Sequence, residues 1–415
     1  MKKVLATILA LVMAIGLCSV SWADATTEVK TEAELTTAVS NGGEIKLGAN
    51  ITLTSMLTIP ADKTVTLDLN GLSITSAGKV IKNNGILTIT DTKRGGKIIS
   101  TGNTAVGVGD NSKTTIKTAI IESVEGAVIT GYATGATINI EGGSFSASDN
   151  AVVAGNGNRT NEAGADRTVG NTINISGGKF YGQIKTPTYV ACGIYAPWKD
   201  TIKVTGGTFN ITGGAGIVAR AGNVTVTNAV FNTTGNATGK VGDSRVVVPC
   251  SAIVFDSEAA YPALTNTAAI SVESGTFTSE ADAISVVKPE GEGAAERVSV
   301  TGGTFSTDVT GYLGEGKILQ KNGDTYTAVT NSGITSGTYT AKPTVPDGYK
   351  VVENTDGTFT VEKVGGYYYY YPTTDTKTTD TKGSPKTFDA GIALYVGMAL
   401  TSAAGVAFVG KKRED

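Results

Sequence analysis

The 415-residue chain contains no histidine, only three cysteines and only two tryptophans. Without histidine it cannot build a Ser-His-Asp or Cys-His catalytic site, an imidazole-ligated zinc site or a histidine general base. Cys18 lies in a predicted leader, so Cys192 and Cys250 are too few for a disulfide framework. No run of aspartates has the spacing of calcium ligands either. We therefore expect no metal site and no cofactor.

The N-terminus has the three parts of a secretory signal peptide. Lys2 and Lys3 precede an apolar stretch over residues 4–17, and small residues follow up to Ala23. We predict that residues 1–23 are removed after export. Loss of the two lysines changes the formal net charge from −3 to −5. Such mild acidity, without a basic stripe to neutralise phosphates, argues against a nucleic-acid partner.

Six segments of the chain share one template, in which β-branched residues alternate before a small pair, a variable residue and phenylalanine. Short apolar runs such as NAVVAG and AGIVAR follow most of them. Alternation with a period of two predicts strands with one buried face, and glycine, of which there are 54, collects between them. The six segments are TINIEGGSF (137–145), TINISGGKF (172–180), TIKVTGGTF (201–209), NVTVTNAVF (223–231), AISVESGTF (269–277) and RVSVTGGTF (297–305).

Two short strands and a variable loop per repeat fit one coil of a right-handed parallel β-helix. Stacked coils bury aligned Val, Ile and Phe in columns inside the tube. We predict this all-β solenoid over residues 44–310, with about 9–12 coils. The alternative is an antiparallel β-sandwich, which also has many short strands but does not repeat one template six times.

Elements at both ends of the solenoid are predicted to close it. A capping box of Thr31 and Glu34 starts a helix that stops at Asn41-Gly42, so residues 24–43 are predicted to form an N-terminal helical cap. Two strand–turn–strand segments within residues 311–364 predict C-terminal hairpins. A spacer rich in Tyr and Thr follows over residues 365–383. Its five consecutive tyrosines are interpreted either as linker or as a surface that stacks on wall glycans.

The C-terminal stretch contains an uncharged segment over residues 390–410. At 1.5 Å per residue it spans about 30 Å, the thickness of a hydrocarbon core. Lys411, Lys412 and Arg413 follow directly, and positive residues stay on the cytoplasmic side. We predict a transmembrane helix that leaves the preceding chain outside the cell.

Together with the residues before the helix, this stretch resembles the sorting signal of Gram-positive cell-wall-anchored proteins. The signal covers residues 384–415, and Ser384, Pro385, Lys386, Thr387 and Phe388 stand at its recognition positions. The resemblance implies that a sortase cuts after Thr387 and joins it to peptidoglycan, so that the protein is displayed on the cell wall. The sequence has Ser384 where Leu is usual and Phe388 where Gly is usual. The alternative is a membrane anchor that is never cut.

The repeat body resembles the pectate-lyase-like β-helices of bacterial surface proteins. Enzymes of this kind carry acidic pairs, or calcium with Arg or Lys, on one outer face. The candidate carbohydrate-site residues here are Asp149, Arg220, Asp256 and Asp282, all at strand ends. We expect the corner Asp and Asn side chains to bond turn backbone instead, and Arg220 to be solvated.

Cys192 and Cys250 are predicted to begin equivalent strands two coils apart, about 9–10 Å, which is beyond the reach of a disulfide. We therefore expect two separate thiols that pack as small apolar groups.

Three functions fit the sequence. The first is a non-catalytic surface protein that binds host or environmental glycans or proteins as an adhesin, through variable loops such as 156–171 and 235–249. The second is a surface polysaccharide lyase or glycosidase. A cluster of acidic residues together with Arg or Lys on adjacent coils would favour this function. The third is a structural component of the wall layer.

Overall fold

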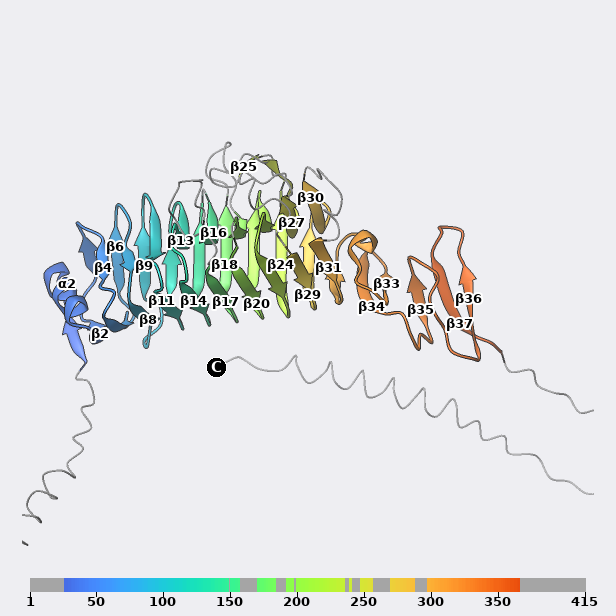
Figure 1. The fold of residues 1–415 in the computed structure, drawn as a ribbon, viewed down its shortest axis with the longest axis horizontal. Coiled ribbons are helices and arrows are strands. Elements are labelled where there is room, and N and C mark those ends of the chain that lie inside the picture. The colour runs from blue at the N-terminus through green and yellow to red at the C-terminus, as the bar shows by residue number, and fades with distance from the viewer. Residues whose placement is uncertain are drawn as a thin grey trace, which may run out of the picture. The chain divides into compact units, whose positions relative to one another are not determined.

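The structure, a computed structural model, describes residues 26–148, 150–156, 170–183, 192–197, 199–235, 239–240, 247–256, 269–287 and 297–365. Three parallel sheets, here called A, B and C, run side by side, and the chain visits them in that order (Figure 1). Each coil therefore has three strands, where the sequence analysis predicted two. The template TINIEGGSF contains both a sheet A strand and a sheet B strand, joined by a corner over residues 141–143.

The strands of the three sheets follow the chain from one end of the solenoid to the other. Sheet A consists of β1 (Thr27–Val29), β2 (Gly43–Leu47), β5 (Thr64–Asp68), β8 (Ile86–Thr90), β11 (Lys113–Ile116), β14 (Thr137–Ile140), β17 (Thr172–Ile175), β20 (Thr201–Val204), β23 (Asn223–Val226), β28 (Ala269–Val272) and β31 (Val298–Val300). The parallel part of sheet B consists of β3 (Ile51–Leu53), β6 (Ser73–Ser76), β9 (Lys97–Ser100), β12 (Ile120–Glu122), β15 (Ser144–Ala147), β18 (Lys179–Gln183), β21 (Thr208–Thr212), β24 (Ala229–Thr234), β29 (Gly275–Ser279) and β32 (Gly303–Phe305). Sheet C consists of β4 (Leu57–Ile59), β7 (Ile81–Asn83), β10 (Thr104–Val108), β13 (Gly126–Gly131), β16 (Ala151–Asn156), β19 (Cys192–Ala196), β22 (Ala215–Ala219), β27 (Ile253–Asp256) and β30 (Ile284–Val287). Because sheet C is nine-stranded, the described residues contain nine three-strand coils, within the predicted range.

The phenylalanines of the six templates form one continuous column inside the solenoid. The parallel register places Phe180 opposite both Phe145 and Phe209, and the pattern continues to the last coil. All six side chains are buried, and neighbouring rings stack with centroids 4.3 to 5.6 Å apart. The column confirms the predicted burial of aligned side chains.

The glycine pair of the template makes room for this column. Gly178 has a φ of 107°, which L side chains rarely adopt. A Cβ at Gly178 would lie 3.3 Å from the rings of both Phe145 and Phe180. Glycine at this corner therefore supplies both the backbone conformation and the space for the stacked rings.

A helix covers the N-terminal end of the solenoid. Helix α2 (Glu32–Asn41) contacts β1 to β4, and its Leu35 and Val39 are fully buried (Figure 1). Thr31 accepts a hydrogen bond from Glu34 N, and the Glu34 carboxylate accepts from Thr31 N at 3.2 Å, so the predicted capping box is present. Strand β1, before the helix, was not predicted.

Removal of the capping hydroxyl is expected to loosen this end of the fold. In Thr31→Ala the amide of Glu34 loses its acceptor, and we expect the free energy of unfolding to fall by about 1 kcal/mol. Urea unfolding followed by circular dichroism measures the change. Thr36→Ala, an exposed threonine in the same helix, is the matched control and should change little. Equal losses in the two variants would contradict the role assigned to the cap.

Antiparallel strands extend sheet B at the C-terminal end. After the short helix η3 (Thr310–Tyr312), hairpin β33 (Lys317–Asn322) to β34 (Thr325–Thr330) pairs with β32. Strands β35 (Gly337–Tyr339), β37 (Phe359–Lys363) and β36 (Tyr349–Glu353) continue the sheet. Both predicted hairpins are present, and β35 is an additional strand.

The spacer beyond residue 365, the sorting-signal residues and the predicted membrane span 390–410 lie outside the described residues. Among the residues that the structure describes, no helix is both long enough and apolar enough to cross a bilayer.

Candidate functional site

The outer face of sheet C is the candidate functional surface, because the long connections of the chain begin and end there. The ranges 157–169, 184–191, 236–238, 241–246, 257–268 and 288–296 lie outside the described residues, and each belongs to a connection into or out of a sheet C strand. The corners from sheet A to sheet B stay short by comparison, as over residues 141–143. Variation in loop length is therefore concentrated on one side of the coil.

The outer face of sheet C carries a buried apolar cluster. Val248 of the small hairpin β25 (Gly239–Lys240) to β26 (Val247–Val248) packs with Val218 and Val254 of the sheet. Cys192 belongs to the same cluster, and burial raises the pKa of its thiol far above the ordinary range. Since the thiolate is the reactive form, Cys192 is a packing residue and not a nucleophile.

Cys250 lies apart from Cys192, as expected, although the two positions are not equivalent. Ile217 pairs with both Ile194 and Ile253, so the position matching Cys192 is occupied by Ser251. The Sγ atom of Cys250 lies 3.1 Å from the carbonyl oxygen of Thr234. Both cysteines are buried thiols, and no disulfide joins them.

Two of the candidate site residues, Arg220 and Asp256, meet at the ends of adjacent sheet C strands. The Nε atom of Arg220 lies 2.8 Å from Oδ2 of Asp256, and Nη1 donates to the hydroxyl of Tyr195 at 3.3 Å. The side chain of Arg220 is 2% exposed and that of Asp256 is 0% exposed. The expectation that Arg220 is solvated is therefore wrong, because the register places it against a carboxylate of the next coil.

This buried pair is suited to holding coils together and not to acting on a polymer. A polysaccharide lyase or glycosidase needs its charged groups at a surface that the chain of sugars can reach. Arg220 and Asp256 supply opposite charges on adjacent coils, as an enzyme site would, but solvent does not reach them. The pair connects β22 to β27, which are separated in sequence by residues 220–252, a stretch that includes β23, β24 and the long connection after β24.

The other two candidates do not join the pair. Asp149 lies outside the described residues. Asp282 is exposed before β30, opposite the position of Ser251, since Ile284 pairs with Ile253. From position 251 to Asp256 there are five residues, or about 16 Å of strand. That exceeds the spacing of about 5–9 Å between the two carboxylates of a glycosidase.

Corner aspartates and asparagines bond to turn backbone, as the sequence analysis expected. The buried carboxylate of Asp91 accepts hydrogen bonds of 2.6 Å from the amides of both Gly71 and Gly96. Partial burial alone would raise the pKa of Asp68, but hydrogen bonds from Thr92 and Asn70 outweigh it and lower that pKa. These carboxylates are therefore used in holding successive turns together.

A third buried acid, Asp200, was not among the candidate residues predicted from the sequence. Its Oδ1 accepts from the backbone amide of Asn171 at 2.7 Å and from the side-chain amide at 3.0 Å. Asn171 in turn donates to the carbonyl of Ala133 and accepts from the amide of Ala136. A single Asp before a strand gives no sequence signal for this network, because its partners come from other coils.

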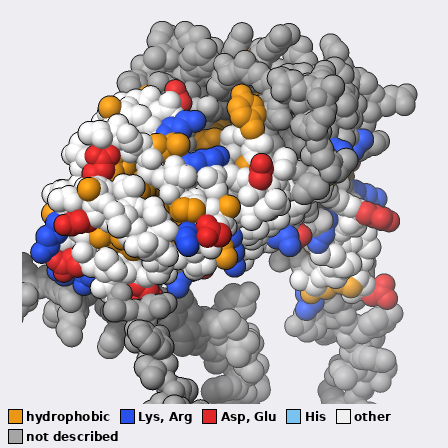
Figure 2. All heavy atoms as spheres, turned by 60° about the vertical axis from the view of Figure 1, so that its left-hand side comes forward, with side chains coloured by type: hydrophobic (Ala, Val, Ile, Leu, Met, Phe, Trp, Pro, Cys, Tyr) orange, Lys and Arg blue, Asp and Glu red, His pale blue; other side chains and the backbone are white. Residues whose placement is uncertain are grey.

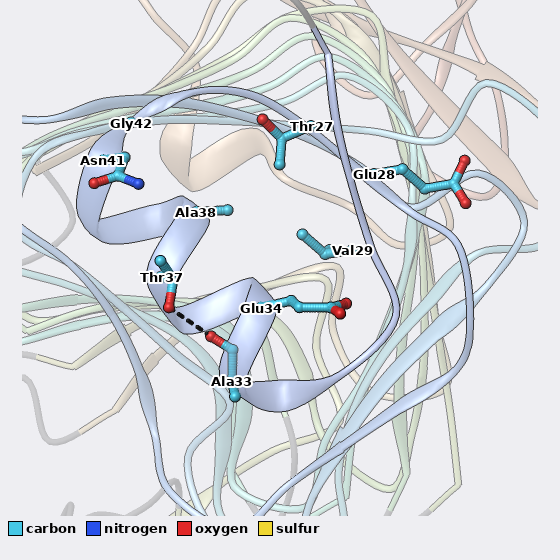
Figure 3. Close-up of a pocket in the computed structure, with 9 residues that line it drawn as sticks. All are labelled: Thr27, Glu28, Val29, Ala33, Glu34, Thr37, Ala38, Asn41 and Gly42. Atoms are coloured by element: carbon cyan, nitrogen blue, oxygen red, sulfur yellow. Dashed lines mark hydrogen bonds between the residues drawn. The ribbon is translucent and has the colours of Figure 1, made fainter.

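A pocket of about 400 Å³ lies between β1 and α2 at the N-terminal end (Figure 3). Val29 and Ala38 are its buried apolar residues. Two of its polar side chains already have partners: Glu34 accepts from Lys30 N at 2.7 Å, and Thr37 donates to the carbonyl of Ala33 at 2.8 Å. The pocket is therefore part of the end cap and offers no evident set of catalytic groups.

The exposed surface carries charges of both signs. On the face shown in Figure 2, basic and acidic side chains are interspersed among uncharged ones, and no continuous patch of one sign is visible. No group of three or more potential metal ligands occurs in the part of the chain that the structure describes. The chain matches no protein-family model, and no curated protein or solved structure is significantly similar to it.

Proposed function

We propose that the protein is a non-catalytic, surface-displayed β-solenoid that mediates adhesion or another interaction at the cell envelope through the loop-bearing side of sheet C. The concentration of long connections on that one side carries the proposal. A rigid stack that presents variable loops on one face is a common way to build a binding surface. Burial of the Arg220–Asp256 pair and the distance to Asp282 weigh against the alternative of a polysaccharide lyase or glycosidase.

The proposed solenoid is right-handed, because connections between parallel strands of one sheet are right-handed in about 98% of cases. Its partners would be host or environmental glycans or proteins. The C-terminal sequence supports display on a Gram-positive cell wall: residues 1–23 would direct export, a sortase would act at residues 384–388, and residues 390–410 would hold the substrate in the membrane. Without cleavage the protein would remain anchored in the membrane.

Wall anchoring predicts a specific dependence on Thr387. In Thr387→Ala the residue that would be joined to peptidoglycan is lost, so the protein should move from the wall fraction to the membrane fraction. Fractionation of cells, with mass spectrometry of the C-terminal peptide, measures this. Thr374→Ala in the spacer is the matched control and should stay in the wall fraction. A protein found in the membrane with residues 388–415 intact, even without substitution, would establish a permanent anchor.

Binding is tested by exchange of one sheet C connection in the full-length protein on cells. Residues 157–169 are replaced by a Gly/Ser segment of equal length, and cells are applied to an array of immobilised glycans and matrix proteins. The spots that bind cells with the unaltered protein are identified first. The affinity of the variant for those spots should fall about tenfold or more, which is a loss of at least about 1.4 kcal/mol of binding free energy. Equal exchange of spacer residues 373–383 should leave binding unchanged. Unchanged binding in the first variant, or release of sugars from an arrayed polysaccharide, would count against the proposal.

A further inference from the structure

The two ends of sheet B are protected differently. At the N-terminal end, helix α2 contacts the edge strand β3, and its Glu32 carboxylate accepts hydrogen bonds from the backbone amides of Thr54 and Ser55 at 2.8 and 3.1 Å. At the C-terminal end, β36 is the last strand of the sheet, and among the described residues it pairs only with β37 (Figure 1). An unpaired edge presents backbone N–H and C=O groups that are ready to accept another strand.

The hydrogen bonds at the two ends of β36 show which of its backbone groups face this open edge. The carbonyl of Gly348 accepts from Val364 N at 2.8 Å, and Asn354 N donates to the carbonyl of Thr358 at 2.7 Å. Hydrogen-bonded pairs alternate along an antiparallel ladder, so the even-numbered residues of the strand bond to β37. The backbone groups of residues 349, 351 and 353 therefore point to the open edge.

The side chains of β36 do not block this edge. Lysine often protects an exposed edge from pairing. Here Lys350 Nζ lies 3.0 Å from Oε2 of Glu362, the residue directly opposite on β37, so its charge is directed into the sheet. Val351 is half-buried opposite the buried Val361, and Tyr349 packs against the apolar cluster that contains Val361. The edge is therefore apolar around Val351.

Strand β36 is complementary to a second copy of itself in an antiparallel arrangement. A twofold axis beside Val351 pairs that residue with its own copy and pairs Tyr349 with Glu353 of the second copy. Backbone hydrogen bonds then join the two Val351 residues, and each Glu353 amide donates to the opposite Tyr349 carbonyl. The Tyr349 amide needs no partner, because it donates to the carbonyl of Pro346 at 3.3 Å. An axis at Lys350 or at Glu353 would instead place like charges opposite each other, which is unfavourable.

We propose that β36 is the interface of a symmetric dimer, in which a second copy of the chain adds its own β36 antiparallel to the first. The occupant is a second copy because the edge matches itself in hydrogen bonding, in apolar contact at Val351 and in charge. Sheet B then continues through both copies, and the two solenoids extend in opposite directions from the axis. The contact involves one five-residue strand per copy, so the dimer is reversible. The proposal is independent of what the sheet C face binds.

Disulfide trapping in the full-length protein tests the dimer. Val351→Cys, Val352→Cys and Lys350→Cys are each treated with oxidised glutathione, and covalent dimers are measured on non-reducing gels; the native Cys192 and Cys250 are buried. At the axis, the two Cα atoms of position 351 lie about 5.5 Å apart, which a disulfide can span. The two copies of position 350 or 352 are offset by a further 7 Å or so along the strands, which is too far. Dimers should form at least about tenfold faster from Val351→Cys than from either neighbour.

Equal rates at the three positions would overturn the proposal, because random collision between copies has no register. Failure of Val351→Cys to form dimers would overturn it as well, since the edge would then be open or covered by something other than a second copy.

Sedimentation of the full-length protein in detergent gives a second measurement that needs no cysteine. Val351→Lys places two lysines opposite each other at the axis, so this variant should be monomeric at concentrations where the unaltered protein is dimeric. Thr325→Lys, at an exposed position of β34, is the matched control and should leave the dimer intact. A dimer that persists in Val351→Lys would contradict the assignment of β36 as the interface.

Discussion

Phe209→Ala is expected to destabilise the solenoid by about 3–5 kcal/mol, the usual cost of removing a buried aromatic ring. Phe209 lies in the middle of the column, with ring centroids 4.3 Å from Phe180 and 4.4 Å from Phe231, and is fully buried. Each coil contacts only its neighbours, so a cavity here weakens the contact between the two halves of the stack.

Urea unfolding followed by circular dichroism measures this loss. Thr212→Ala, an exposed position on the same strand β21, is the matched control and is expected to change the free energy of unfolding by less than about 0.5 kcal/mol. Phe209→Leu, which keeps part of the volume, should lie between the two. If Phe209→Ala lowered the free energy of unfolding no more than Thr212→Ala does, the column would not hold the coils together.

Arg220→Ala is expected to cost about 3–5 kcal/mol, because it leaves the carboxylate of Asp256 buried without its ion-pair partner. The double variant Arg220→Met with Asp256→Leu removes both charges and keeps apolar volume, so it should be considerably more stable than the single variant. Urea unfolding of Arg220→Met, of Asp256→Leu and of the double variant gives the coupling energy between the two side chains directly.

The exposed ion pair of Lys97 and Glu122 is the matched comparison. It also links neighbouring coils, with Nζ 3.1 Å from Oε1, but both side chains are more than a third exposed. Lys97→Met should therefore cost no more than about 1 kcal/mol. If Lys97→Met and Arg220→Ala lowered the free energy of unfolding by similar amounts, burial of the Arg220–Asp256 pair would contribute nothing to stability.

Features with a local sequence signal were predictable. The small pair before each phenylalanine, a glycine pair in four of the six templates, marks a corner, and Gly178 adopts a positive φ there against the rings. The capping box at Thr31 and the turns of the two hairpins also depend on residues a few positions apart. These signals gave the parallel stack, the helix and the hairpins.

Features that depend on contacts between coils were not predictable. The corner over residues 141–143 is so short that β14 and β15 look like one repeat unit, which hid the third strand of each coil. The burial of Arg220 depends on Asp256, which is distant in sequence and becomes adjacent only through the strand register. Asp200 meets Asn171 for the same reason.

The central claim, that the sheet C side is the binding face, is tested most directly by masking one face at a time. Tyr132→Cys, at an exposed residue after β13 of sheet C, and Lys113→Cys, at an exposed residue of β11 in sheet A, lie in the same coil. Each is coupled to polyethylene glycol maleimide on cells that display the full-length protein, and binding to the glycan and protein array is measured. Loss of binding from the label at 132 but not from the label at 113 is the result we predict. Loss from the label at 113 alone, or equal retention with both labels, would contradict the account.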